Sequence, residues 1–367
     1  MRVPFVDLKA QYKNIKKEID TAISRVIAET AFVRGQYVEQ FEKLYAKAYG
    51  IPYCISCGNG TDAIYVALKA LGIGKNDEVI TTASSWISSS QTISQAGARV
   101  VFADIEPDFF TIDPVDIERK ITNKTKAIIP VHIYGQPASM DKIMAIAEQY
   151  NLYVIEDCAQ SHFATYKGKL VGTFGHVGTF SFYPGKNLGA YGDAGAIVSS
   201  DEDFSIRARM FANHGSIVKH QHEMEGINSR MDGIQAAVLS VKLKYIHEWN
   251  ESRARHADWY NKMLATLPEI TTPKLHSDRS HVFHLYVIRS KVRDVLQTKL
   301  KNAGIQTAIH YPVSLPLLNA YKYLGYTASD FPVSYQYQDE ILSLPMYPEM
   351  TEEMRNFVLQ EIHELFD

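Results

Sequence analysis

The chain reads Ser181-Phe-Tyr-Pro-Gly-Lys186-Asn-Leu-Gly-Ala-Tyr-Gly-Asp193-Ala-Gly195 near its centre, and this stretch decides the predicted fold and chemistry. Upstream of it, Tyr153-Val-Ile-Glu-Asp157 has the composition of a buried strand that ends in carboxylates. The proline and the glycines on either side of Lys186 predict a tight loop. Ligands of open α/β sheets bind at the carboxyl ends of the strands, so we expect Lys186 and Asp157 to flank one site there.

The residue types of this stretch suit a cofactor that carries an aldehyde. A lysine that forms an imine must lose its proton, and burial on a tight loop lowers its pKa. Pyridoxal phosphate also needs a carboxylate beside its ring nitrogen, which keeps that nitrogen protonated and lets the ring act as an electron sink. Lys186 and Asp157 suit these two roles, but a lone lysine and a lone aspartate are more often an exposed loop residue and a helix cap.

Longer motifs distinguish these interpretations. The chain resembles the pyridoxal phosphate-dependent nucleotide-sugar aminotransferases of the DegT/DnrJ/EryC1/StrS family, and the resemblance covers essentially its whole length. The matching segments are Pro4-Phe-Val-Asp7-Leu, Glu156-Asp157-Cys-Ala-Gln160-Ser161, residues 181–189, Gly192-Asp-Ala-Gly-Ala, His310-Tyr311-Pro312 and Leu342-Ser-Leu-Pro-Met346. This resemblance implies an α/β protein with the fold type I of pyridoxal phosphate-dependent aminotransferases.

Composition and length limit the alternatives. With 367 residues the chain is long enough for two domains, and a net charge of -3 gives no general attraction to nucleic acid or to a membrane. No apolar run has the length of a signal peptide core or of a membrane span, so we expect a cytoplasmic protein. Cys54 and Cys57 have the spacing of a redox or zinc motif, but no second pair accompanies them. We interpret them as structural.

The order of the expected elements predicts two domains. Strand-like and helix-like segments alternate over the first 250 residues, which predicts a mostly parallel sheet with helices on both faces. We predict a large cofactor-binding α/β domain at residues 1–250 and a small α+β domain at residues 251–367. The elements expected around and after this boundary are one long helix from Asp232 to about Leu267, strands at 282–288 and 305–309, and helices at 292–303 and 351–366.

A glycine-rich turn predicts an anion site. A strand at Tyr53–Cys57 leads into Gly58-Asn-Gly60-Thr61-Asp-Ala63, and glycines that open a helix present free backbone N–H groups. The turn also matches the dinucleotide fingerprint Gly-x-Gly-x-x-Ala, which requires an acid at the end of the next strand. That strand, Val79-Ile-Thr-Thr82, ends in threonines. The family resemblance implies that Gly60 and Thr61 bind the phosphate of the cofactor.

The resemblance assigns further residues to the site. It implies that the indole of Trp86 stacks on the cofactor ring, that Gln160 lies near the ring hydroxyl, and that Ser181 binds the phosphate. On composition alone, Trp86 and the pair His310-Tyr311 would be structural. The remaining residues that the resemblance implies are Asn228, which reaches the cofactor phosphate of the partner subunit, and Arg230, His310 and Tyr311, which face the sugar nucleotide.

One histidine cluster falls outside these motifs. His214, His220 and His222 lie near Glu223, but their spacing matches no helical zinc pair. We therefore predict a loop there and no metal.

The resemblance implies an amino transfer with Lys186 and Asp157 as the catalytic residues. The amino group of L-glutamate would move to a keto group of a dTDP- or UDP-linked hexose, in a homodimer with a shared active site. The form of residues 181–195 is more similar to members that aminate C3 than to members that aminate C4. The product would serve a cell-surface polysaccharide or glycoconjugate, such as the O-antigen of lipopolysaccharide.

Other functions fit less well. A P-loop NTPase would need a glycine at Phe180 and a serine or threonine at Asn187. A dehydratase of the same family would carry histidine in place of Lys186. A C4 aminotransferase and a non-catalytic sensor of pyridoxal phosphate or of a sugar nucleotide, which would keep the lysine, both stay open on the sequence alone.

Overall fold

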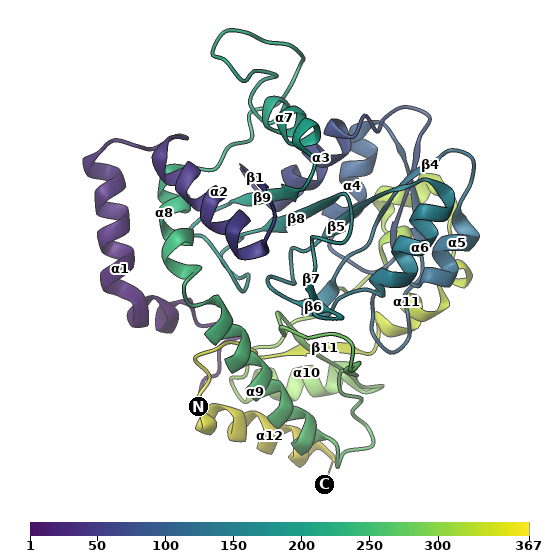
Figure 1. The fold of residues 1–367 in the computed structure, drawn as a ribbon. Coiled ribbons are helices and arrows are strands. Elements are labelled where there is room, and N and C mark those ends of the chain that lie inside the picture. The colour runs from purple at the N-terminus through teal and green to yellow at the C-terminus, as the bar shows by residue number, and fades with distance from the viewer. Residues whose placement is uncertain (367) are drawn as a thin grey trace.

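The centre of the molecule is a seven-stranded sheet with the strand order β1-β9-β8-β5-β4-β2-β3 (Figure 1), in a computed structural model that describes residues 1–366. Neighbouring strands are parallel except that β9 runs antiparallel to both β1 and β8. The prediction of a mostly parallel sheet is therefore confirmed. The strands are β1 (Tyr53–Cys57), β2 (Glu78–Thr82), β3 (Arg99–Ala103), β4 (Thr125–Ile129), β5 (Tyr153–Asp157), β8 (Val177–Ser181) and β9 (Gly195–Ser199).

Helices cover both faces of this sheet because its strands alternate between two apolar cores. Val154 and Ile155 are both fully buried, yet they belong to different cores, as expected of successive residues in a strand. Parallel strands also need crossover connections, which helices provide. The helices are α1 (Leu8–Ala28), α2 (Gln36–Tyr49), α3 (Gly60–Ala70), α4 (Ser88–Ala96), α5 (Pro114–Lys120), α6 (Met140–Tyr150) and α7 (Glu202–Phe211).

The single helix predicted from Asp232 to about Leu267 is wrong, because two helices occupy this stretch. They are α8 (Gly233–Lys242) and α9 (Ile246–Leu264), and a turn separates them. The physical reason is that α9 begins in the core that contains α8, through Ile246 and Trp249, and then continues into a different core. Val238 packs in the core beside the central sheet, whereas Tyr260 packs in the core of the C-terminal part. A single straight helix could not keep its apolar side chains in contact with both cores.

The C-terminal part contains a small antiparallel sheet and the helices that cover it. The sheet pairs β10 (Tyr286–Arg289) with β11 (Ile341–Leu344), and the helices are α10 (Arg293–Asn302), α11 (Pro332–Tyr337) and α12 (Glu352–Phe366). The strand predicted at 282–288 begins only at Tyr286. The strand predicted at 305–309 is wrong, because that segment makes only single bridges, through Ile305 and Ala308.

The N-terminus packs in this C-terminal core. Val3 is fully buried there and pairs with Ile305.

Residue 250, near which we predict the domain boundary, lies inside α9. The remaining short elements are β6 (Thr165–Tyr166), β7 (Lys169–Leu170), and the 3-10 turns η1 (Ile133–Gly135), η2 (Leu315–Leu317), η3 (Asn319–Leu324) and η4 (Ala328–Asp330). Within residues 1–366 every helix is too short or too polar to cross a membrane.

Candidate active site

Lys186 lies on the loop between β8 and β9, as predicted. The loop is compact: a Cβ atom added at Gly189 would lie 2.3 Å from the carbonyl oxygen of Pro184. Burial lowers the pKa of Lys186 from 10.5 to about 8, although the carboxylate of Asp157 acts in the opposite direction. Lys186 therefore carries a neutral amine much more often at pH 7 than an exposed lysine does.

Asp157 ends β5 and is only 5% exposed. Its Oδ2 atom accepts a hydrogen bond from Ser89 Oγ at 3.0 Å, and its Oδ1 atom accepts one from the backbone N–H of Ala159 at 3.1 Å. Burial raises the pKa of Asp157, while these two hydrogen bonds and the charge of Lys186 lower it. A carboxylate held in this way is suited to a cationic group of a ligand.

The anion site predicted at the start of α3 meets the end of β8. A Cβ atom added at Gly60 would lie 2.5 Å from the Cβ atom of Ser181, so only glycine fits without displacement. Thr61 Oγ1 lies 2.7 Å from Ser88 Oγ at the start of α4. Two serine hydroxyls, a threonine hydroxyl and the first N–H groups of α3 thus lie at one sheet edge, an arrangement suited to a phosphate.

Aromatic and polar side chains form a second group, around Tyr311. Gln160 Nε2 donates a hydrogen bond to Tyr311 Oη at 3.1 Å, and Gln160 Oε1 accepts one from the N–H of Tyr134 at 2.6 Å. The rings of Trp86 and Tyr311 lie 5.8 Å apart. Trp86 is 59% exposed, so most of its indole is free to contact a ligand.

His310 precedes Tyr311 and is held by β11. Its Nδ1 atom lies 2.8 Å from Ser343 Oγ. Burial lowers the pKa of His310 to about 4, and the positive charge of Lys186 adds to this effect. The imidazole of His310 is therefore neutral at pH 7.

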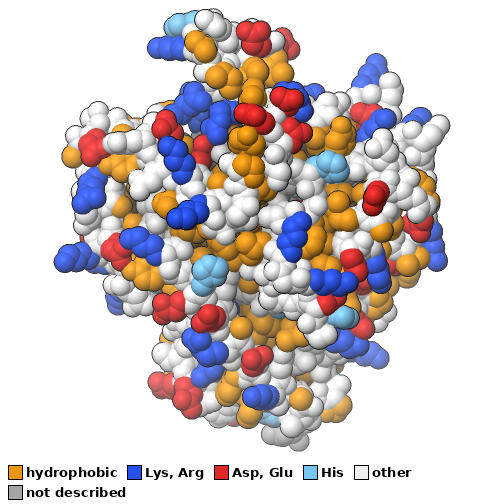
Figure 2. All heavy atoms as spheres, in the orientation of Figure 1, with side chains coloured by type: hydrophobic (Ala, Val, Ile, Leu, Met, Phe, Trp, Pro, Cys, Tyr) orange, Lys and Arg blue, Asp and Glu red, His pale blue; other side chains and the backbone are white. Residues whose placement is uncertain are grey.

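Asn228 and Arg230 flank Ser229, whose Oγ atom donates to Asp62 Oδ2 at 2.6 Å and accepts from the N–H of Gly58 at 2.9 Å, beside the predicted anion site. They follow the loop that projects beyond α7 at the top of Figure 1. Asn228 is exposed, and its backbone pairs with Asn213. Arg230 lines a depression together with Arg34 and Arg209, and Figure 2 shows Lys and Arg side chains gathered near the base of the projecting loop. Within residues 1–366, neither side chain bonds to the group around Lys186.

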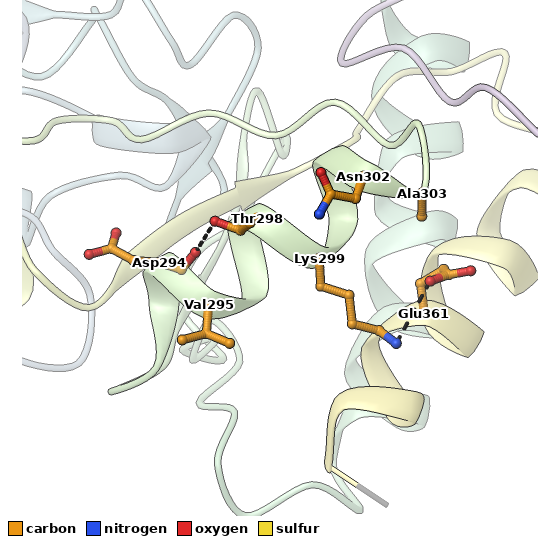
Figure 3. A pocket seen from close by; sticks show the side chains of 7 residues that line it. All are labelled: Asp294, Val295, Thr298, Lys299, Asn302, Ala303 and Glu361. Atoms are coloured by element: carbon orange, nitrogen blue, oxygen red, sulfur yellow. Dashed lines mark hydrogen bonds and ion pairs between the residues drawn. The ribbon is translucent and has the colours of Figure 1, made fainter.

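Two other features do not belong to this group of residues. A shallow depression of about 720 Å³ lies between α10 and α12 (Figure 3), and none of the predicted site residues lines it.

His132, Glu156 and Cys158 offer three buried ligand atoms within 4.8 Å of one another, a cluster that was not predicted from the sequence. The Glu156 carboxylate already accepts hydrogen bonds from His132 and from three backbone N–H groups of residues 172–175. The role of Glu156 is therefore structural.

Ser88 and Ser89 are site residues that the sequence did not predict. Both lie in the first turn of α4, and Ser89 reaches across the sheet edge to Asp157. The signal was available in the run of serines that follows β2, because that strand ends at the same edge as β5.

The chain is similar to known proteins over its full length. A model of the DegT/DnrJ/EryC1/StrS aminotransferase family matches residues 13–363. The "Pleiotropic regulatory protein" of Geobacillus stearothermophilus is 45% identical, over 100% of this chain and 99% of the relative. The dTDP-3-amino-3,6-dideoxy-alpha-D-galactopyranose transaminase of Aneurinibacillus thermoaerophilus is 42% identical, over 98% of this chain and 99% of the relative.

Solved structures agree with this match. The Streptomyces venezuelae protein DesV in complex with a ketimine intermediate has a TM-score of 0.97 and 39% identity, over 99% of this chain and 98% of that chain. A Bacillus subtilis structure with the bound cofactor PMP has a TM-score of 0.91 and 34% identity, over 99% of this chain and 85% of that chain.

Proposed function

The chain belongs to the DegT/DnrJ/EryC1/StrS aminotransferase family, and we propose that it aminates C3 of a nucleotide-linked keto hexose with L-glutamate as the donor. Pyridoxal 5′-phosphate is its cofactor. The names of relatives support the C3 position, because they include dTDP-3-amino sugar transaminases and a UDP-N-acetyl-3-dehydro-alpha-D-glucosamine 3-aminotransferase. A dTDP or a UDP sugar is consistent with these relatives.

The observation that carries this proposal is the convergence of Lys186, Asp157 and the Gly60–Ser181 contact at one edge of the sheet. These residues fit the cofactor: a buried amine with a lowered pKa, a buried carboxylate, and an anion cradle that a Cβ atom at Gly60 would fill. When bound, the cofactor supplies an electron sink for the carbon that loses or gains a proton.

The chain's own residues divide the remaining work. Lys186 holds the cofactor covalently and, once released, its amine moves a proton. Asp157 keeps a positive charge on the ring nitrogen, and Gln160 binds near the ring hydroxyl. Gly60, Thr61 and Ser181 bind the phosphate, while the exposed indole of Trp86 offers a stacking surface to the ring. The burial of Asp157 supports its role, because it excludes the water that would otherwise screen the charge of the carboxylate.

The sugar nucleotide contacts neutral groups and one arginine. We assign the sugar to His310 and Tyr311, because both are neutral at pH 7 and can bond hydroxyl or keto oxygens without changing charge. Arg230 binds near the nucleotide portion. Because the Asn228 side chain is exposed and makes no bond to the group around Lys186 in its own chain, we infer a homodimer in which Asn228 serves the phosphate of the partner subunit.

We also infer the cell compartment and the use of the product. We infer the cytoplasm, supported by three free, buried cysteines. The amino sugar then serves a cell-surface polysaccharide or glycoconjugate.

A second candidate function is a non-catalytic sensor of pyridoxal phosphate or of a sugar nucleotide. The regulatory name of the Geobacillus stearothermophilus relative favours it. Such a protein would keep Lys186 and the cofactor but would not turn over, so turnover distinguishes the two functions.

The deciding experiment compares absorbance spectra of the wild type and of the Lys186→Ala variant after incubation with pyridoxal phosphate. We expect a lysine-bound cofactor band in the wild type alone, and a shift to the pyridoxamine form after addition of L-glutamate. The glutamate-treated protein should then convert a 3-keto dTDP or UDP hexose to the 3-amine and leave the 4-keto isomer unchanged, with the products identified by NMR. No bound chromophore in the wild type would overturn the proposal. Conversion of the 4-keto isomer alone would correct the position, and a band indifferent to glutamate and to both sugars would favour the sensor.

A further inference from the structure

Asn187, the residue after Lys186, is only 3% exposed and uses all of its polar groups. Its Nδ2 atom donates to Asn250 Oδ1 at 2.8 Å and to the carbonyl oxygen of Val282 at 2.9 Å. Its Oδ1 atom lies 3.2 Å from His284 Nδ1. The residue that follows the lysine is therefore attached both to α9 and to the segment before β10.

These bonds determine the tautomer of His284. Because both Nδ2 protons of Asn187 are donated, its Oδ1 atom is the acceptor, and His284 Nδ1 must carry the proton. Burial lowers the pKa of His284 well below its ordinary value, with the charge of Lys186 as the next cause. His284 is therefore a neutral ring with its Nδ1 proton directed at Asn187.

Asn250 extends the connection to the phosphate side of the site. Its Nδ2 atom donates to the carbonyl oxygen of His162 at 2.9 Å, and His162 Nε2 lies 2.9 Å from the carbonyl oxygen of Ser181. The chain on both sides of Lys186 is thus joined to the half-buried Asn250 of α9, through the backbone carbonyl of Ser181 on one side and the side chain of Asn187 on the other. A surface lysine loop has no need of such anchoring.

Residues 282–285, to which the Asn187 side chain bonds, are themselves hydrogen-bonded to residues near the site. The N–H of Val282 donates to the carbonyl of Gly135 at 3.0 Å, and the N–H of Leu285 donates to that of Tyr134 at 3.1 Å. Tyr134 in turn binds Gln160. Asn187 therefore places Lys186 relative to residues from both the central sheet and the C-terminal part.

We propose that Asn187, Asn250 and His284 are positioning residues, which hold Lys186 in one orientation at the edge of the sheet and keep water from its amine. The proposal rests on the role given to Lys186 above. The role of Lys186 then depends on side chains outside the expected site.

The surroundings of Lys186 make this role measurable. The titratable groups whose charge interacts with it are Asp157, His162, His284 and His310. Burial keeps the three histidines neutral, so Asp157 is the one charged member of this set at pH 7. The lowered pKa of Lys186 then depends on exclusion of water, and a loosened loop would let that pKa rise.

The test measures the titration of Lys186 in the cofactor-free protein, from the pH dependence of its acetylation by acetic anhydride followed by mass spectrometry of its peptide. The wild type should give a midpoint near 8. Asn187→Ala and Asn250→Ala should raise this midpoint by about one pH unit, because water reaches the amine. Asn261→Ala is the matched control, because Asn261 also lies in α9 and its half-buried side chain accepts a hydrogen bond from Tyr286 Oη, away from the lysine loop.

In the cofactor-loaded enzyme, Asn187→Ala and Asn250→Ala should lower kcat about tenfold and leave KM for the keto sugar within about twofold, because orientation of the amine is lost and binding is not. A fall in melting temperature with an unchanged Lys186 midpoint would overturn the proposal, since the bonds would then be merely structural. An equal shift in Asn261→Ala would overturn it as well.

These outcomes are separable from failure of the proposed function. The acetylation measurement uses no cofactor and no substrate, whereas the proposed function fails when the wild type binds no cofactor. If Asn187→Ala does not fold, Asn250→Ala decides alone, because Asn250 lies one bond further from the loop.

Discussion

At the scale of single residues, Asp157 depends on the hydroxyl of Ser89. The hydrogen bond from Ser89 Oγ lowers the pKa of the carboxyl against the effect of burial. Without it, the carboxyl retains a proton more readily and holds a positive charge on the cofactor less well.

We therefore predict that Ser89→Ala lowers kcat by about tenfold, the size of effect typical of a residue that orients a reactive group. Steady-state kinetics with saturating cofactor measures this. Ser90→Ala is the control, because Ser90 lies in the same turn but bonds to Tyr321 Oη. Equal losses in the two variants would show that the turn, rather than the bond to Asp157, matters.

His162 gives a prediction on pH and stability. It is fully buried and stacks on Phe180 and Phe182. Burial lowers the pKa of His162 from 6.5 to about 3, with the charge of Lys186 as a further cause. As the pH falls below 6.5, the unfolded chain therefore binds a proton here that the folded chain does not. Its contribution to stability is fully present above pH 6.5 and is lost as the pH falls toward about 3.

We expect His162→Gln to weaken the acid dependence of folding. Between about pH 4 and pH 6, the free energy of unfolding of the variant should change by ~1.4 kcal/mol per pH unit less than that of the wild type. Urea unfolding at one protein concentration measures it, and His220→Gln on the exposed loop is the control. Parallel pH profiles of wild type and His162→Gln would contradict the prediction.

At the scale of elements, the contact between the start of α3 and the end of β8 shapes the anion site. Gly60 has no room for a side chain, because a Cβ atom would overlap Ser181. A larger residue would push the first turn of α3 away from β8 and separate the groups assigned to the phosphate.

Gly60→Ala should therefore destabilise folding by about 1–3 kcal/mol and weaken cofactor binding. Thermal unfolding and titration with pyridoxal phosphate measure the two effects. Gly74→Ala is the matched control, since a Cβ atom there meets only the carbonyl oxygen of Ala96, at an ordinary 3.5 Å. An unchanged affinity of Gly60→Ala for pyridoxal phosphate would show that the contact between Gly60 and Ser181 does not shape the phosphate site.

The turn between α8 and α9 is the second feature at this scale. Lys242, at the end of α8, is 1% exposed, and its Nζ atom donates to the carbonyl oxygen of Gly189 at 2.7 Å. Burial lowers the pKa of Lys242 to about 8. The lysine loop is therefore held from α8 by Lys242 and from α9 by Asn250.

At the scale of the whole molecule, a homodimer in which Asn228 serves the partner's phosphate site predicts complementation between subunits. In a hybrid of Lys186→Ala and Asn228→Asp subunits, one site combines an intact Lys186 with an intact Asn228 from the partner. Randomly mixed subunits should then regain about a quarter of wild-type activity, since half of the dimers are hybrids with one intact site.

Refolding the two inactive variants together and assaying amino transfer measures this recovery. Each variant refolded alone is the control. No recovery, despite hybrid dimers found by native mass spectrometry, would place Asn228 in the site of its own chain.

Much of the fold was predictable because burial is periodic along each element. The alternation of apolar segments predicted the parallel sheet, and the proline and glycines predicted the loop that carries Lys186. The break between α8 and α9 was not predictable in this way, because helical spacing continues through it. The prediction of a strand at 305–309 was wrong for a related reason. An apolar segment with β-branched residues forms a strand only if the edge of another strand lies beside it, and this segment makes only single bridges.

The sequence by itself determined the architecture, the family and the residue types of the site, because these depend on local pattern and on motifs in a fixed order. Only the tertiary structure decided how those residues are supported. Ser89 bonds to a carboxylate 68 positions away, and Asn187 bonds to partners 63 and 97 positions away. Such contacts have no periodicity in the sequence, because packing of whole elements brings the two atoms together.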